Sequence, residues 1–163
     1  MFSKLLFVCL FNCLIMTYTL NASENTMNFN KETKGLVRKI LVYKNPSWVS
    51  KIITNESKEF YFVSPKSMFD FYFDSEKWSA ANIKDKNQIK ELVVTNYANL
   101  RPIDAKKAYY VYGANKISSA GDDLPAFELY SQAKKFAKEN NGKRILKFNE
   151  ITKGLIELLN GDI

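Results

Sequence analysis

The chain has no histidine and only two cysteines among its 163 residues. Cys9 and Cys13 both lie in an apolar N-terminal stretch, so the rest of the chain offers neither imidazole nor thiol. Serine–histidine–aspartate triads, cysteine–histidine pairs and the usual zinc sites all need one of these groups. Paired carboxylates for glycoside chemistry cannot be located by spacing either. We therefore expect a protein that is not an enzyme.

The N-terminus has the order of features that is typical of a secretory signal peptide. Lys4 gives a positive start, residues 5–16 form an apolar core, and small residues follow near Ala22. The apolar run is shorter than the roughly 20 residues of a transmembrane helix. We expect residues 1–22 to be a signal peptide and the protein to be periplasmic. Membrane association is expected only if this segment stays uncleaved.

Cleavage after residue 22 would remove both cysteines, so no disulfide would support the mature fold. The net charge of the chain is +7, which by itself suggests an anionic partner. Export argues against nucleic acid, and lysine is abundant along the whole chain, as an AT-rich coding bias would give. The densest basic stretch, Lys134 to Lys153, is spaced like the outer face of a helix and the strand after it. We interpret these cations as a solvated surface.

Residues 23–34 are polar and predict a flexible lead-in. Ser64 and Pro65 predict a helix start, with serine at the N-cap and proline at the first helical position. The residues that follow, to Phe73, are apolar on nearly every side, so this helix should be buried. Residues 74–88 are expected to be loop, held to the core by Trp78. The patterns predict strands at 37–44, 47–54, 59–63 and 89–97.

A second passage resembles the first: aligning the two places Phe62 over Phe127 and Phe71 over Phe136. It predicts strands at 108–112, 124–129 and 144–148, a loop at 114–123 and a helix at 131–140. The sequence thus predicts an α+β fold of two similar ββαβ halves in one domain, 35–163. The halves cover about 35–97 and 98–149, and an amphipathic C-terminal helix at 149–160 is capped by Asn149 and ended by Gly161.

Few residues remain that can hold a metal ion. Asp122 and Asp123 adjoin in a glycine-containing loop and offer oxygen ligands, although such pairs are usually just solvated. Met68 lies in the apolar helix and is most simply a core residue. Of the two methionines after the predicted signal peptide, only Met27 lies outside the predicted core, so it is the only soft-metal candidate.

Several passages, in their order and spacing, carry a resemblance to a known family. They are Val42-Tyr43-Lys44-Asn45-Pro46-Ser47-Trp48-Val49, Tyr61-Phe62 with Met68-Phe69-Asp70-Phe71-Tyr72-Phe73, Pro102-Ile103-Asp104-Ala105-Lys106-Lys107-Ala108-Tyr109-Tyr110-Val111-Tyr112-Gly113, Pro125-Ala126-Phe127, Phe136-Ala137-Lys138 and Ile145-Leu146-Lys147-Phe148-Asn149-Glu150-Ile151. From Lys34 to Ile151 the chain resembles the NosL family, the accessory proteins of nitrous oxide reductase. The resemblance implies an exported copper-handling protein with two similar ββαβ halves.

The residues that the resemblance would offer to copper are replaced. Family members typically carry Cys-x-x-Cys-Gly-Met before the Val-Tyr-Lys segment, where this chain has residues 35–40 with Arg38 and Lys39. Members often carry Pro-Met-Gly-His in a later loop, where this chain reads Ser119-Ala120-Gly121-Asp122. The usual lipid-anchor cysteine is missing too. A cation repels copper, so no copper-binding residue is carried over, and copper is implied by the resemblance only.

We therefore expect an exported accessory protein that assists the maturation or assembly of a periplasmic copper enzyme through protein contacts, without a cofactor. Loops on a rigid frame commonly carry such contacts. The contact candidates are Gly113, Ser119, Gly121, Asp122 and Asp123. One alternative is a copper carrier that uses Met27, backbone groups or a dimer interface. Another is a small-ligand binding protein with an aromatic-lined pocket between the halves.

Overall fold

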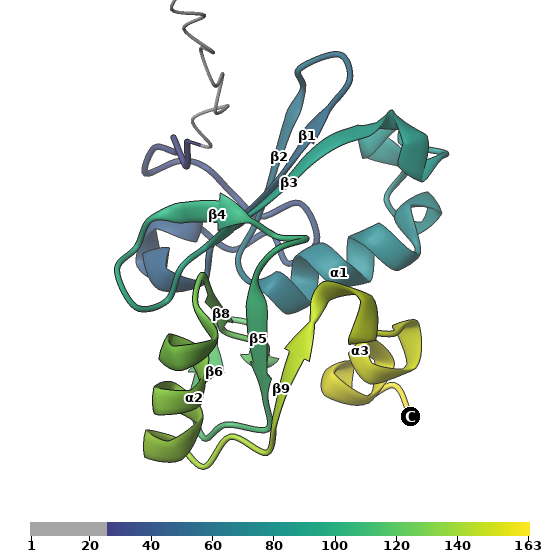
Figure 1. The fold of residues 1–163 in the computed structure, drawn as a ribbon. Coiled ribbons are helices and arrows are strands. Elements are labelled where there is room, and N and C mark those ends of the chain that lie inside the picture. The colour runs from purple at the N-terminus through teal and green to yellow at the C-terminus, as the bar shows by residue number, and fades with distance from the viewer. Residues whose placement is uncertain (1–25) are drawn as a thin grey trace, which may run out of the picture.

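Two antiparallel sheets, each covered by a helix, form the fold (Figure 1). The computed structural model describes residues 26–163, so Cys9, Cys13 and the predicted signal peptide lie outside the described part. The first sheet has the strand order β2-β1-β3-β4. Its strands are β1 (Ser50–Thr54), β2 (Glu59–Phe62), β3 (Ile89–Thr95) and β4 (Pro102–Asp104), and the helix that packs on it is α1 (Pro65–Phe73).

The second sheet has the order β8-β5-β9. Its strands are β5 (Tyr109–Tyr112), β8 (Ala126–Phe127) and β9 (Arg144–Lys147), and the helix that packs on it is α2 (Tyr130–Glu139). In each half the first strand is central and the strands before and after the helix flank it, which confirms the predicted α+β fold with a ββαβ repeat. A parallel bridge between Asn96 and Ala126 joins the two sheets. The small hairpin of β6 (Ile117–Ser118) and β7 (Gly121–Asp122) and the helix α3 (Lys153–Asn160) complete the fold.

The helix α1 begins where the sequence predicts. The Ser64 hydroxyl accepts a hydrogen bond from the Ser67 amide at 3.3 Å, and Pro65 takes the first helical position. Met68, Phe69 and Phe71 are fully buried against the first sheet and the second half. An apolar surface on nearly every side suits a helix that packs on both sides.

Three predicted strands are wrong or too long. The predicted strand 47–54 shortens to β1, because a 3-10 turn covers Pro46–Trp48. The stretch 37–44 forms no strand but one bridge, Lys34 to Leu41, and a 3-10 turn over Val42–Lys44. Its backbone turns back at Lys39, whose φ is 59°, so the apolar residues there pack without a ladder. The predicted strand 124–129 shortens to β8, because Pro125 lacks the N–H that a ladder needs.

The C-terminal helix begins later than predicted. Asn149 lies in a 3-10 turn, Phe148–Glu150, and the N-cap of α3 is Thr152, whose hydroxyl accepts from the Leu155 amide at 3.2 Å. The Phe148 ring lies 5.2 Å from the Phe69 ring, centroid to centroid, and anchors the chain before the helix. Gly161 ends α3 in the left-handed conformation, as predicted.

Part of the polar lead-in packs on the domain. Met27 and Phe29 are half-buried against a cluster of Val42, Val49 and Val63. The rings of Phe29 and Tyr61 meet edge to face at 6.2 Å. Residues 26–34 therefore cover one side of the first half, while residues 23–25 lie outside the described part.

One main core joins the two halves. It contains Phe62 and Phe71 from the first half and Tyr110, Leu124 and Leu146 from the second. Aromatic rings fill it, since Phe69 touches both Tyr110 and Phe148 with centroids 5.3 and 5.2 Å apart. Among residues 26–163 no helix is long and apolar enough to cross a membrane.

Candidate functional site

A buried lysine organises the polar centre of the molecule. Lys66, in the first turn of α1, is 2% exposed, and its ammonium donates to the carbonyls of Ala120 at 2.7 Å and Leu159 at 3.0 Å. Leu159 belongs to the last turn of α3, whose free carbonyls carry partial negative charge. Burial lowers the pKa of Lys66, and the nearby Asp123 opposes this shift. Lys66 therefore ties α1, the β6–β7 turn and the end of α3 together.

Asp123 is the second buried ionisable group of this centre, and it is 4% exposed. Its carboxylate accepts from the amides of Lys66 and Leu124, both at 2.8 Å, and from the Ser118 hydroxyl at 2.6 Å. Burial raises its pKa, although these hydrogen bonds act in the opposite direction. Asp122, next in sequence, is exposed. The two aspartates thus differ in role, and only Asp123 holds the loop in place.

The two segments that stand where the family motifs would be lie side by side. Ala120, in the β6–β7 turn, packs against the buried cluster of Val42, Val49 and Val63, as does Ile40. The Asn45 amide donates to the Ser119 hydroxyl at 3.0 Å. Tertiary structure therefore brings the segment 35–45 to the loop 119–122, although many residues separate them in sequence.

A second cation, Arg38, faces the same centre. Its guanidinium donates to the Asn160 side chain at 2.7 Å, and the Asn160 amide donates to Asp70 at 3.2 Å. The charge of Arg38 lowers the pKa of Lys66, as expected for neighbouring like charges. Arg38 thus lies in the stretch 35–40 that the resemblance matches to a copper motif, and Lys66 lies beside the other matched stretch, at the carbonyl of Ala120.

The predicted contact residues fall into two places. Ser119, Gly121, Asp122 and Asp123 lie together at the β6–β7 hairpin, and Gly121 has a φ of 87°. A Cβ on Gly121 would lie 3.9 Å from the Lys66 ammonium, so the backbone approaches the lysine closely here.

Gly113 lies apart, at the end of β5. Its φ is 73°, and a Cβ there would come within 2.8 Å of the Lys143 side chain. The loop 113–123 is therefore not one surface: only its second part faces the Lys66 centre.

The two methionines of the described chain do not form a pair. Met27 packs with Val42, Val49 and Val63, whereas Met68 is fully buried in the main core. Residues 26–163 contain no group of three or more histidine, cysteine, aspartate or glutamate side chains that could hold a metal ion.

The donor set around Lys66 does not fit Cu(I). Cu(I) favours thiolate, thioether and imidazole ligands. Lys66 and Arg38 present positive charge here, and the nearby acceptors are backbone carbonyls and amide or carboxylate oxygens. We find no described residues that would hold copper at this centre.

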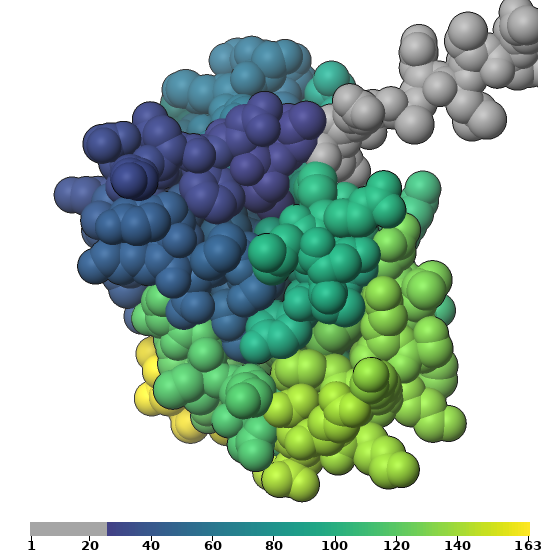
Figure 2. Space-filling view, turned by 90° about the vertical axis from the view of Figure 1, so that its left-hand side faces the viewer, coloured from purple at the N-terminus to yellow at the C-terminus, as the bar shows by residue number. Residues whose placement is uncertain are grey.

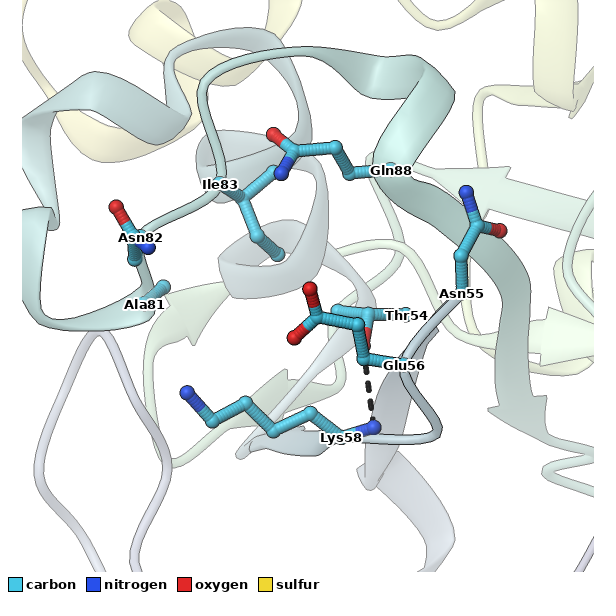
Figure 3. A pocket seen from close by; sticks show the side chains of 8 residues that line it. All are labelled: Thr54, Asn55, Glu56, Lys58, Ala81, Asn82, Ile83 and Gln88. Carbon is cyan, nitrogen blue, oxygen red and sulfur yellow. Dashed lines mark hydrogen bonds between the residues drawn. The ribbon is translucent and has the colours of Figure 1, made fainter.

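A polar cleft of about 190 Å³ lies at the far end of the first sheet (Figure 3). The β1–β2 turn and the segment 81–88 form it, and its lining residues are Thr54, Asn55, Glu56, Lys58, Ala81, Asn82, Ile83 and Gln88. Small-molecule sites usually measure roughly 300 to 1,000 Å³. This cleft is smaller, lies within one half and has no aromatic lining, so it does not match a pocket between the halves.

Sequence reasoning missed Lys66. Ser64, two residues before it, is the N-cap that the sequence predicts, but the sequence pattern assigned no role to Lys66. One signal was present: Lys66 is the only cation from Phe60 to Phe73, within a stretch that is otherwise mostly apolar. A lone cation in such a stretch needs acceptors from elsewhere in the fold.

The NosL family model matches residues 26–156 of this chain. The solved structure of the copper chaperone NosL from Shewanella denitrificans has a TM-score of 0.68 and 21% sequence identity to it. This likeness covers 80% of this chain and 98% of the other, and shows a shared fold. No curated protein matches the chain. Because the family model spans most of the sequence, this chain belongs to the NosL family.

Proposed function

We propose that this protein is an exported accessory protein that assists the maturation or assembly of a periplasmic copper enzyme through protein contacts. Family membership supports a role related to copper, as does the fold shared with a copper chaperone. In this proposal the chain does not catalyse a reaction, and it does not carry copper by itself.

One observation carries the proposal: the Lys66 ammonium is held by Ala120 and Leu159 at the centre where the missing motifs would meet. A fixed positive charge disfavours a second cation nearby, and the effect is strong where water is excluded. Arg38 adds to it. The scaffold is kept while the ligand chemistry is replaced, which favours work through contacts.

The contact surface would lie around the β6–β7 hairpin. Ile117 of β6 is 63% exposed, and Leu158 of α3 is 50% exposed. The helix α3 lies against β7. Exposed apolar side chains beside polar groups are a usual composition for a protein interface.

Copper carriage is tested by anaerobic titration of residues 23–163 with Cu(I) against a competing chelator. We expect the protein not to remove Cu(I) from the chelator, and we expect the Met27→Leu variant to give the same result as the wild type. Tight stoichiometric binding would contradict the replaced-ligand proposal. Loss of that binding in Met27→Leu would then assign the copper to the thioether.

Protein contact is tested by crosslinking in a periplasmic extract of the host. We expect a specific partner with the wild type, and its loss with Ile117→Asp. The matched control is Leu100→Asp, because Leu100 is 54% exposed on the turn after β3 and lies outside the proposed surface. Equal capture by both variants, or no specific partner with the wild type, would count against the hairpin surface.

A further inference from the structure

A basic face lies on the second half, away from the Lys66 centre. We define it by Lys134, Lys135 and Lys138 of α2, Lys143 just before β9, and Lys147 at the end of β9. Residues 129–147 carry six cationic side chains and one carboxylate, Glu139, while the whole chain has a net charge of +7. The charge of the protein is therefore concentrated here. Figure 2 shows α2 in light green at the lower part of one face of the molecule.

The lysines of α2 share its outer side. Ala133 and Phe136 are buried against the second sheet, so the side chains of Lys134, Lys135 and Lys138 project from the opposite side. With Ser131 and Glu139 they line a shallow open depression. None of the three lysines forms an ion pair with any residue between 26 and 163. Three positive charges thus face one negative charge, that of Glu139, across this depression.

The strand β9 extends this face. Tyr109 pairs with Lys147 and Val111 with Ile145, so these side chains lie on the side of the sheet that α2 covers. The Lys147 ammonium lies 3.2 Å from the centroid of the Tyr109 ring. Tyr109 in turn meets Tyr130 at 5.5 Å between centroids. The basic face therefore continues from α2 to the edge strand.

Apolar side chains adjoin the cations. Leu129 and Tyr130, at the start of α2, are 53% and 51% exposed. Two carboxylates besides Glu139 border the face: Glu128 precedes Leu129, and Glu150 accepts from the Lys147 amide at 2.7 Å. Both lie at the end of the face that holds Tyr130 and Lys147, so the three lysines of α2 dominate the rest of it.

We propose that this face binds the surface of an anionic phospholipid bilayer. A bilayer surface can bind the lysines and the apolar residues of this face together. The lysines contact the anionic headgroups, while Leu129 and Tyr130 enter the boundary between headgroups and acyl chains. An acidic protein would complement the charge of the lysines. It would not explain why two apolar residues, Leu129 and Tyr130, are exposed beside them. The proposal is independent of the proposed function and would hold the accessory protein at a membrane without a spanning helix.

The test is flotation of residues 23–163 with phosphatidylcholine vesicles that contain about one quarter phosphatidylglycerol. We expect binding to these vesicles, none to pure phosphatidylcholine, and release by salt, which screens exposed charges. Each lysine near such a surface contributes about fivefold, so Lys134→Gln, Lys135→Gln and Lys138→Gln together should weaken binding about a hundredfold. All three positions are exposed, and thermal unfolding checks that the variant is folded.

The charge-matched control is Lys31→Gln, Lys34→Gln and Lys84→Gln, three exposed lysines outside the second half. It should bind like the wild type. In Tyr130→Trp, the new tryptophan should shift its emission to the blue with anionic vesicles. No binding to anionic vesicles at low salt, equal weakening by the control, or an unshifted tryptophan would overturn the proposal. Crosslinking to an acidic protein that requires the same three lysines, without vesicle binding, would also overturn it.

Discussion

Asp123 holds the β6–β7 hairpin through a single carboxylate. Three donors from three positions converge on it: the amides of Lys66 and Leu124 and the hydroxyl of Ser118. Donors buried in this way cost free energy when their acceptor is removed, because water cannot replace it. The loop that carries the proposed contact surface therefore depends on one residue that is itself not accessible.

Asp123→Ala should lower the free energy of unfolding by about 3 kcal/mol, because it leaves buried donors without an acceptor. Urea denaturation measures the change. The matched control is Asp122→Ala, whose exposed side chain should change stability by less than about 0.5 kcal/mol. If the two variants were equally stable, Asp123 would not organise the loop.

Glu59 anchors a second buried cation. Lys51 is 1% exposed and donates to Glu59 at 2.7 Å, and the Tyr61 hydroxyl donates to the same carboxylate at 2.7 Å. Burial would raise the pKa of Glu59, but the hydrogen bonds from Lys51 and Tyr61 and the charge of Lys51 together lower it below 4.5. The group thus binds fewer protons when folded than when unfolded.

Glu59 should therefore add stability above pH 4.5 and lose this contribution as the pH falls through its folded pKa. We expect the stability difference between wild type and Glu59→Gln to shrink as the pH is lowered from about 7 to about 3. Urea denaturation across this range gives the measurement. Glu56→Gln, an exposed change on the same hairpin, should show no such trend, and a constant difference for Glu59→Gln would refute the assignment.

At the scale of elements, α3 shows how a cap is chosen. Asn149 and Thr152 both suit an N-cap, and both precede an apolar stripe. Phe148 is held by the rings of Phe69 and Tyr72, at 5.2 and 5.4 Å, so the chain is still turning at Asn149. The helix can begin only after Ile151, which is buried in the main core.

Thr152→Ala should cost about 1 kcal/mol, the usual effect of removing an N-cap hydroxyl. Asn149→Ala should cost less than about 0.5 kcal/mol, because its side chain caps no helix. Thermal or urea unfolding of the two variants compares them directly. A larger loss at Asn149 would place the helix start where the sequence alone had suggested.

At the scale of the molecule, the two halves share one core. Leu146 of the second half and Phe71 of the first belong to the same buried cluster. The fold should therefore unfold in one cooperative step, as small domains usually do. Trp48 and Trp78 both lie in the first half, so their fluorescence reports on that half.

Leu146→Ala should destabilise the protein by about 3 kcal/mol through the cavity it leaves. The tryptophan signal should shift to lower urea by as much as the far-UV circular dichroism signal, although the change lies in the other half. Leu158→Ala, at a position that is 50% exposed, is the control and should shift neither signal by much. A tryptophan signal that stayed in place would show that the halves unfold separately.

The sequence by itself determined the repeated order of elements and the start of α1. Local chemistry suffices there, since Ser64 and Pro65 fix a helix start within one turn, and alternating apolar residues fix which face of a strand is buried. The absence of histidine could also be read directly, because a side chain that is absent from the sequence cannot be supplied by folding.

Only the tertiary structure decided which of the remaining residues meet. Lys66, Ala120 and Leu159 are far apart in sequence, and their hydrogen bonds exist because α1, the β6–β7 turn and α3 converge. The tertiary structure also decided the different roles of Asp122 and Asp123, which are adjacent in sequence and chemically identical. Burial and long-range partners differ between them, and these depend on packing between distant segments, which no local pattern encodes.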